Sequence, residues 1–189
     1  LGEPEDKMGW KGSDTRSVYF DNMVIPGKNI LGDIKTGYKQ FLQTLTAGRI
    51  TIAALSIGIA QGAYESALNY TNEREAFGKK INQFQAVSFK LADMATQIEA
   101  AKLLVYNAAW LKDQGKDVIK SAAMAKLFSS EAAMKITTDA IQIHGGYGYI
   151  REYNVERFFR DAKILEIGEG TSEIQRLIIS REILKDFKF

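Results

Sequence analysis

The sequence predicts an all-α protein, an antiparallel four-helix bundle with a short remnant of β-structure at its N-terminus. Apolar residues recur at helical spacing from Asp33 almost to the end of the chain. The only prolines are Pro4 and Pro26, so no proline interrupts the helical pattern that follows them. Glycine-rich segments divide this pattern into stretches with short connections, which is typical of antiparallel bundles.

The first 32 residues differ from the rest. Ser17–Phe20 and Met23–Ile25 are short runs that favour strands, and Pro26-Gly27 closes them as a turn. Two such runs are too few to bury a sheet. We therefore expect residues 1–32 to be the end of a β-domain whose other strands are missing, and residues 33–189 to be the helical domain.

Two long helices come first. One is predicted from about Asp33 to Asn72, and the next carries a clearer pattern in which apolar steps of three and four residues alternate, as in left-handed helix packing. Gly115 is a candidate C-terminal cap for the second helix. The positions of the first pattern are Leu42, Leu45, Ile52, Leu55, Ile59, Ala63 and Leu68, and those of the second are Phe84, Val87, Leu91, Met94, Ile98, Ala101, Val105 and Ala108.

The last part of the chain is also helical. A third helix, roughly residues 117–142, is rich in alanine, so that neighbouring helices can approach it closely. A short helical stretch around Val155–Arg160 is followed by a predicted loop, Glu166–Gly170. Thr171 or Ser172 can then cap the final helix.

Composition excludes several classes of function. The 25 Lys and Arg nearly balance the 23 Asp and Glu, which leaves no basic footprint for nucleic acid or an anionic membrane. The chain has no cysteine and one histidine, and no Glu-x-x-His pair, so that thiolate, iron–sulfur, zinc and di-metal sites are not expected. Residues 1–11 do not resemble a secretion signal, and we expect a cytoplasmic or, in a eukaryote, a mitochondrial-matrix location.

With cysteine absent and histidine nearly so, acid–base chemistry falls to carboxylates, tyrosines or lysines, and Glu169 is the most interesting candidate. It lies between two glycines in a loop that opens a helix, where close backbone approach to a ligand is possible. The alternative is a solvated glutamate in a turn.

Two other segments could bind a ligand. Arg74, followed by Phe77-Gly78-Lys79-Lys80, suggests a phosphate clamp, or simply a basic helix terminus. The segment Gln142–Tyr149 has the glycine density of a ligand-binding loop, but no strand precedes it and a Rossmann site is not predicted. His144, within it, is expected to be a packed or hydrogen-bonded residue rather than a base.

Read together, these segments resemble the C-terminal part of an acyl-CoA dehydrogenase, and the resemblance covers the whole chain. The matching motifs occur in the family's order. They are Gly12–Arg16 with Val18–Asp21 and Val24–Pro26, Gly48-Arg49, Arg74 with Phe77–Lys79, Phe84-Gln85, Gln142–Tyr149, Arg157 with Arg160-Asp161, and Glu169–Gln175.

The resemblance implies a fold and a reaction. The family has an N-terminal helical domain, a central β-domain and a C-terminal four-helix bundle, with FAD between the last two, and it usually assembles as a tetramer through the bundles. This sequence resembles the end of the β-domain plus the bundle, so that it is expected to be a fragment. The implied activity is α,β-dehydrogenation of an acyl-CoA to the 2,3-enoyl-CoA, with an electron-transfer flavoprotein as electron acceptor.

The resemblance also assigns roles to individual residues. Glu169 would be the base that removes the α-proton, because the alternative position for the base in some relatives is Gly48 here. The remaining assignments fall into two groups. The FAD-binding residues would be Arg74, Gln85, Gln142, Ile143, His144, Gly145 and Gly146 toward a neighbouring subunit, and Thr171, Ser172 and Glu173 within the same one, while Thr46, Ala47, Gly48, Arg49 and Gly170 would lie along the acyl-CoA.

Thr46 stands where many relatives have an aspartate, so contacts to the CoA arm are not assigned to it with the rest of the motif. Among the family's subtypes, the resemblance is taken to imply a short or short-branched acyl chain. The alternative function is a catalytically silent helical module that only oligomerises.

Overall fold

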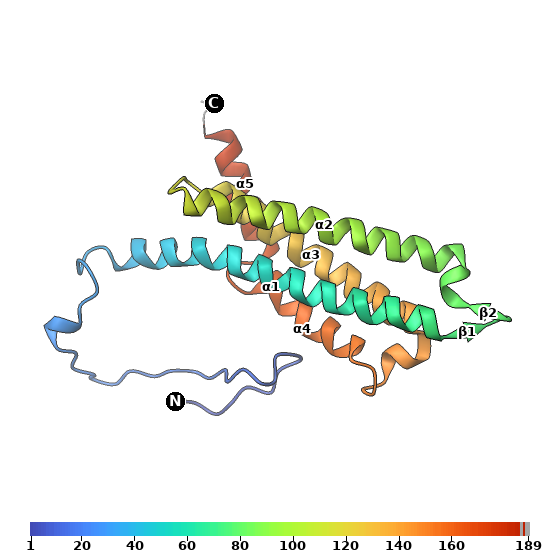
Figure 1. The fold of residues 1–189 in the computed structure, drawn as a ribbon. Helices are drawn as coiled ribbons and strands as arrows, with labels where there is room; N and C mark the ends of the chain where they lie inside the picture. The colour runs from blue at the N-terminus through green and yellow to red at the C-terminus, as the bar shows by residue number, and fades with distance from the viewer. Residues whose placement is uncertain (186, 188–189) are drawn as a thin grey trace.

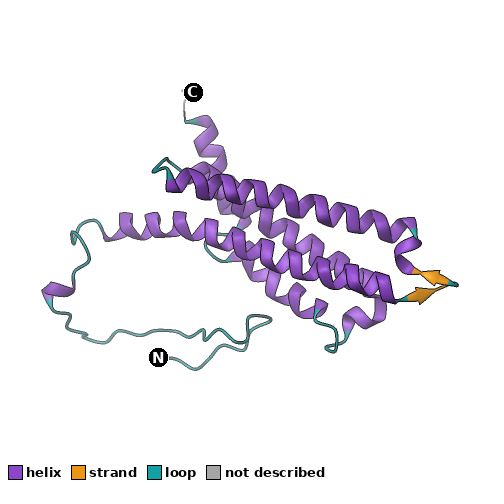
Figure 2. Cartoon of the chain, viewed as in Figure 1, coloured by secondary structure: helices purple, strands orange, loops and turns teal. Residues whose placement is uncertain are grey.

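Helices make up most of the chain and lie side by side in a bundle (Figures 1 and 2). The computed structural model describes residues 1–185 and 187. Its helices are α1 (Gly37–Glu73), α2 (Gln85–Asp113), α3 (Ile119–His144), α4 (Val155–Ile167) and α5 (Ser172–Leu184). The all-α prediction is confirmed, and the three long helices begin and end within a few residues of the expected limits.

The fourth helical stretch differs from the expectation. The short helix expected around Val155–Arg160 continues as α4 to Ile167, so that the expected loop from Glu166 was wrong in its first two residues. Ala162 and Leu165 are buried and extend the packed face of α4 beyond Arg160. In the described chain α4 and α5 thus follow the three long helices, with a break at residues 168–171 between them.

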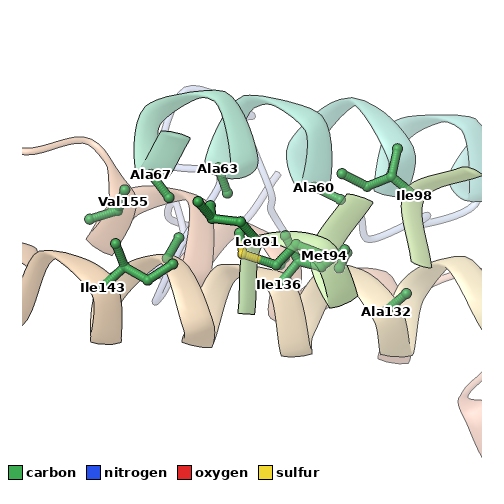
Figure 3. Close-up of a cluster of buried hydrophobic side chains, with 13 residues drawn as sticks. Ala60, Ala63, Ala67, Leu91, Met94, Ile98, Ala132, Ile136, Ile143 and Val155 are labelled. Carbon is green, nitrogen blue, oxygen red and sulfur yellow. The ribbon is translucent and has the colours of Figure 1, made fainter. Parts of the chain in front are cut away.

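The main core lies where α1, α2, α3 and α4 meet (Figure 3). Alanines of α1 face Leu91 and Met94 of α2 and Ile136 of α3, and Val155 of α4 closes one end. A smaller cluster around Ile50 fills the bundle near the α2–α3 connection. All six buried residues of α2 belong to the periodic pattern that predicted this helix.

The buried face of α1 consists mainly of small residues. Leu42 and Leu55 are 43% and 37% exposed, and the large apolar residues of the predicted pattern are at most partly buried. By length and composition, α1 is the one helix of the described chain that could cross a membrane, a test that a bundle's core helix also passes. Its fully packed positions are Arg49, Ile50, Ala53, Ser56, Ala60, Ala63, Ala67 and Thr71.

A short hairpin connects α1 and α2 at one end of the bundle (Figure 2). Its strands are β1 (Glu75–Ala76) and β2 (Lys79–Lys80), which pair antiparallel with Glu75 opposite Lys80. Phe77 and Gly78 between them both have positive φ, at 51° and 79°, as a two-residue turn of type I′ requires. The 3₁₀ turn η2 (Ile81–Gln83) then leads into α2.

The segment before α1 forms no strand, and it runs as an extended loop beside the bundle (Figure 1). Residues 17–25, expected to be strand-like, have no paired strand among the described residues. The segment contains one 3₁₀ turn, η1 (Gly27–Asn29). Trp10 attaches its first part to α4, since its backbone N–H donates to the Asp161 carboxylate at 2.6 Å and its indole N–H to the Asp161 carbonyl at 2.8 Å. The division at residue 32 stays a prediction.

Candidate functional site

The loop between α4 and α5 holds Glu169 in an unusual backbone conformation. Gly168 ends α4, and its N–H donates to the Ile164 carbonyl at 2.7 Å. Glu169 then has φ of +55° and Gly170 has φ of +92°. Positive φ is uncommon for a residue with a β-carbon, and it persists where the surroundings hold it in place. This conformation turns the chain sharply between the two helices.

The Glu169 carboxylate lies directly against Gly48 of α1. A β-carbon placed on Gly48 would lie 2.6 Å from Glu169 Oε2 and 3.1 Å from Cδ, so that any larger residue would displace the carboxylate. Glu169 itself is half-buried. The structure thus brings together the candidate base and one of the predicted substrate-binding positions, from opposite parts of the sequence.

Two buried side chains hold the loop from beneath. Lys126 of α3 and Gln175 of α5 are both 0% exposed. The Lys126 ammonium donates to the Gly170 carbonyl at 2.7 Å, and Gln175 Nε2 donates to the same carbonyl at 2.8 Å. Gln175 Nε2 also lies 3.4 Å from the Glu169 carbonyl, a weaker contact.

Charge is concentrated at this end of the bundle. Arg49 is 7% exposed, and its Nε has no hydrogen-bond partner among the described residues. Burial lowers the pKa of Arg49, while the Glu169 carboxylate opposes this effect. Burial likewise lowers the pKa of Lys126, a trend that Glu166 opposes and Arg49 reinforces. A guanidinium stays protonated in proteins, so Arg49 brings a positive charge to the region of Glu169.

The other predicted residues of α1 and α5 are close by in sequence but contact their own helices. Thr46 donates its hydroxyl to the Leu42 carbonyl at 3.1 Å, and Ala47 beside it is half-buried. Thr171 caps α5 by accepting the Ile174 N–H at 3.4 Å. Ser172 is buried, and its hydroxyl has no partner among the described residues.

Beside Ser172, Glu173 is exposed in the first turn of α5. Its carboxylate accepts hydrogen bonds from its own backbone N–H and from Thr171, which lower its pKa. The N-terminus of α5 is therefore a polar edge beside the Glu169 loop.

A second group of predicted residues lines a cavity of about 520 Å³ at the opposite end of α3. Arg74, Ile143 and His144 border it, together with the backbone of Gly145 and Gly146. A β-carbon on either glycine would meet no atom within 4 Å, so both leave their backbone open to a ligand. The Arg74 guanidinium lies 5.6 Å from the Tyr147 ring centre, within cation–π range.

His144 is a packed residue in this cavity wall. Its ring stacks on Tyr70 with ring centres 4.2 Å apart, and Nδ1 lies 2.8 Å from the Ala140 carbonyl. Burial lowers the pKa of His144, and the Ala140 carbonyl opposes this. The structure therefore favours the core interpretation of His144, with one edge of the residue facing the cavity.

The structure does not bring all predicted cofactor residues together. Gln142 faces a different cavity, bordered by Tyr149 and Arg160, and Gln85 borders neither. The Arg74–His144 cavity and the Glu169 loop are also far apart. Lys126 and His144 lie 18 residues apart on α3, about 27 Å along the helix axis. A single bound molecule within one chain would have to span most of the bundle to reach both.

An apolar cavity of about 400 Å³ borders the Glu169 loop at Gly168. It lies between the Lys7–Trp10 segment, α1 and the end of α4, and Ile52, Leu55 and Ile167 are among its lining residues. Among the residues that the structure describes, no group of three or more acidic, histidine or cysteine side chains could hold a metal ion.

Sequence reasoning missed Lys126 and gave Gln175 no role. A signal was present for Lys126, because it interrupts a stripe of small residues on the alanine-rich helix: Ala122, Ser129, Ser130 and Ala133. Gln175 is the last residue of the motif that contains Glu169. In neither case does the spacing reveal that both side chains reach one carbonyl.

Residues 35–184 match the family model described as "Acyl-CoA dehydrogenase, C-terminal domain". The chain belongs to the acyl-CoA dehydrogenase family. It is 56% identical over 98% of its length to the probable acyl-CoA dehydrogenase YngJ of Bacillus subtilis, and covers 49% of that protein. The resemblance stated from the motifs is thereby confirmed.

Two further family members are informative. The caffeyl-CoA reductase-Etf complex subunit CarC of Acetobacterium woodii is 49% identical over 98% of this chain and 49% of that protein. The structure of butyryl-CoA dehydrogenase from Megasphaera elsdenii superposes with a TM-score of 0.95 at 48% identity, covering 97% of this chain and 48% of that one. The chain spans about half the length of the relatives it matches.

Proposed function

We propose that this chain is the C-terminal domain of an FAD-dependent acyl-CoA dehydrogenase in which Glu169 removes the α-proton of the substrate. The observation that carries the proposal is the Glu169 carboxylate held in the space left by Gly48, at a left-handed turn between two helices. A base at a carbonyl-activated carbon must be fixed in place and partly shielded from water. Glu169 is half-buried and meets both needs.

In the proposed reaction the bond between the α-carbon and its hydrogen breaks, and the proton passes to Glu169. A hydride leaves the β-carbon, and the electron pair left at the α-carbon forms the new carbon–carbon double bond. When bound, FAD supplies the acceptor for this hydride. The buried Arg49 guanidinium brings a positive charge to the region of the Glu169 carboxylate.

The residues at both ends of α3 are suited to hold FAD. At the start of α5, the unpartnered Ser172 hydroxyl is an available hydrogen-bonding group, and Thr171 and Glu173 lie on either side of it. Arg74 and the open backbone at Gly145 and Gly146 form the other candidate site. Their separation supports the view that the two sites serve the FAD molecules of different subunits.

Substrate and partners follow the same line of reasoning. We propose a short or short-branched acyl-CoA, because a butyryl-CoA dehydrogenase is among the similar structures. An electron-transfer flavoprotein is proposed as the electron acceptor, since the name of the CarC relative places it in a complex with one. Homo-oligomerisation through the bundle completes the proposal.

The deciding experiment replaces Glu169 by Gln in the full-length, FAD-loaded enzyme. Gln keeps the size of the side chain but cannot accept the α-proton. We expect the variant to bind FAD and butyryl-CoA as the wild type does, and to lose anaerobic flavin bleaching by about 100-fold or more. Bleaching at the wild-type rate would remove Glu169 from the mechanism.

A panel of acyl-CoA thioesters tests the substrate proposal with the wild-type enzyme. Fastest bleaching is expected with chains of about four carbons, in keeping with the similarity to a butyryl-CoA dehydrogenase. Fastest bleaching by a long-chain thioester would overturn the chain-length proposal but leave the role of Glu169 intact.

A further inference from the structure

The Glu169 turn is strained, and the loop itself offers little to hold it. Glu169 adopts a positive φ of 55°, which is unfavourable for a residue with a β-carbon. Gly168 is tied to α4 on one side, and Thr171 caps α5 through a long hydrogen bond of 3.4 Å on the other. The Gly170 carbonyl between them is the best anchored group of the loop.

Two donors converge on that carbonyl from two different helices. Lys126 Nζ lies 2.7 Å and Gln175 Nε2 lies 2.8 Å from the oxygen. A carbonyl oxygen accepts two hydrogen bonds, so both of its acceptor positions are filled. Because the peptide unit is planar, fixing this oxygen also fixes the Thr171 N–H and the plane between the α-carbons of Gly170 and Thr171. The contact of Gln175 Nε2 with the Glu169 carbonyl at 3.4 Å extends the anchor to the preceding peptide unit.

Lys126 is a costly residue at this position if packing is its only role. It is fully buried among small residues of α3, and no carboxylate of the described chain lies within ion-pair distance of its ammonium. Burying an ammonium group is strongly unfavourable, and an apolar side chain of similar length would fill the space without that desolvation penalty. What the ammonium gains is the bond to Gly170.

We propose that Lys126 and Gln175 are positioning residues, which hold the Gly170 carbonyl and thereby aim the Glu169 carboxylate at the space above Gly48. This inference rests on the proposed role of Glu169 as the base. The two side chains do not touch the substrate in this arrangement; they act through the backbone of the loop.

The test compares Lys126→Met and Gln175→Leu with the wild type in the full-length, FAD-loaded enzyme. Each substitution removes one donor and nearly preserves the side-chain volume. Single-turnover flavin bleaching, followed against butyryl-CoA concentration, separates the limiting rate from the half-saturating concentration. We expect the limiting rate to fall between about 10- and 100-fold for each variant, because a misplaced base reacts slowly. Half-saturation should change by less than about threefold.

A second measurement reports on the loop without requiring activity. Amide hydrogen exchange of the peptide covering residues 165–176 should speed up at least about tenfold in each variant, while exchange in α2 stays unchanged. The matched control is Ile136→Val, a buried change in α3 that touches neither donor. This control should lose stability but keep the limiting rate and the loop exchange of the wild type.

The outcomes are distinguishable. If Lys126→Met keeps the wild-type limiting rate and the wild-type loop exchange, the proposal for Lys126 is overturned. If Lys126→Met does not fold, Gln175→Leu is the test, and wild-type values in that variant overturn the proposal. If Glu169→Gln retains bleaching, Glu169 is not the base. Faster loop exchange in Lys126→Met and Gln175→Leu would still show that the two side chains hold the Gly170 carbonyl, and unchanged exchange would refute this role.

Discussion

At residue 48, the absence of a β-carbon leaves the space that the Glu169 carboxylate occupies. Gly48→Ala should therefore change stability and activity in opposite directions. Alanine favours a helix over glycine by about 1 kcal/mol, so the melting temperature should hold or rise. The new methyl group displaces the carboxylate, and flavin bleaching by the full-length enzyme should slow about 10-fold or more.

The matched control is Gly58→Ala on the same helix. A β-carbon there meets no atom within 4 Å, so the variant gains helix stability without touching the loop. Equal activity of the two variants would contradict the placement of the Glu169 carboxylate against Gly48.

His144 gives the chain a pH dependence of known sign. Burial lowers its pKa below the ordinary value of 6.5. As the pH falls through that value, the unfolded state takes up a proton before the folded state does, and stability decreases. The loss is complete once the pH is below the folded-state pKa. We expect the free energy of unfolding, measured with denaturant, to be smaller at pH 5.5 than at about pH 7.5.

In the wild type, the ring centres of Tyr70 and His144 lie 4.2 Å apart. His144→Phe keeps a ring that can stack on Tyr70, and it removes the only histidine of the chain. This variant should lose the slope between these two pH values. An unchanged slope would assign the pH dependence to other groups.

At the scale of single residues, the sequence identified Glu169 as a candidate base but did not reveal that Lys126 and Gln175 hold its loop. Two flanking glycines pointed to Glu169 as a residue in a loop that opens a helix, whereas the positive φ of Glu169 itself was not predicted. Lys126 and Gln175 donate to the Gly170 carbonyl from positions 44 and 5 residues away in the sequence. Contacts of this kind follow only from the three-dimensional packing of the helices.

At the scale of the elements, α1 and α3 meet through small residues. Ala63 of α1 is 0% exposed and lies in the main core (Figure 3). Ala63→Leu should overpack this contact and destabilise the protein by about 1–3 kcal/mol or more. Ala54→Leu, at an exposed position of the same helix, is the control and should change stability by less than about 0.5 kcal/mol. Thermal or denaturant unfolding compares the two, and equal losses would contradict the close approach of the helices.

The same packing explains which helices could be predicted in detail. In α2 one stripe of buried side chains alternates with polar positions, so the pattern identified the buried face as well as the helix. In α1 the large residues cover several sides, and the face in contact with α3 is made of alanine and serine, whose hydrophobicity does not mark a core. Periodicity therefore predicted α1 as a helix but not its orientation.

The whole molecule exposes more surface than a protein of its size normally does. Its accessible area is 12,604 Å², whereas a compact monomer of 21.1 kDa exposes about 9,000 Å². Large apolar side chains contribute to the excess, including Tyr38 and Phe41 of α1 and Leu103 and Trp110 of α2. Only 22% of the most apolar stretch of α1 is buried. Surfaces of this extent are typical of sites that other protein surfaces cover.

This surface leads to the last prediction, which concerns assembly and flavin retention by the chain alone. The 189-residue chain, purified alone, should sediment as an oligomer, because its apolar faces can be buried against a second copy. It should also carry little flavin, since the candidate FAD residues lie at two separate sites, one beside Arg74 and Gly145 and one at the start of α5, and each is only part of the proposed binding site. Sedimentation and the visible absorption spectrum measure both properties on one sample.

A monomer would contradict assembly through these faces, and a yellow protein would contradict the silent module, because the chain alone would then retain its cofactor. If the chain alone is a colourless oligomer, while the full-length protein is yellow and its flavin is bleached by substrate, then flavin retention depends on the other half of the enzyme. Assembly would then be a property of the bundle.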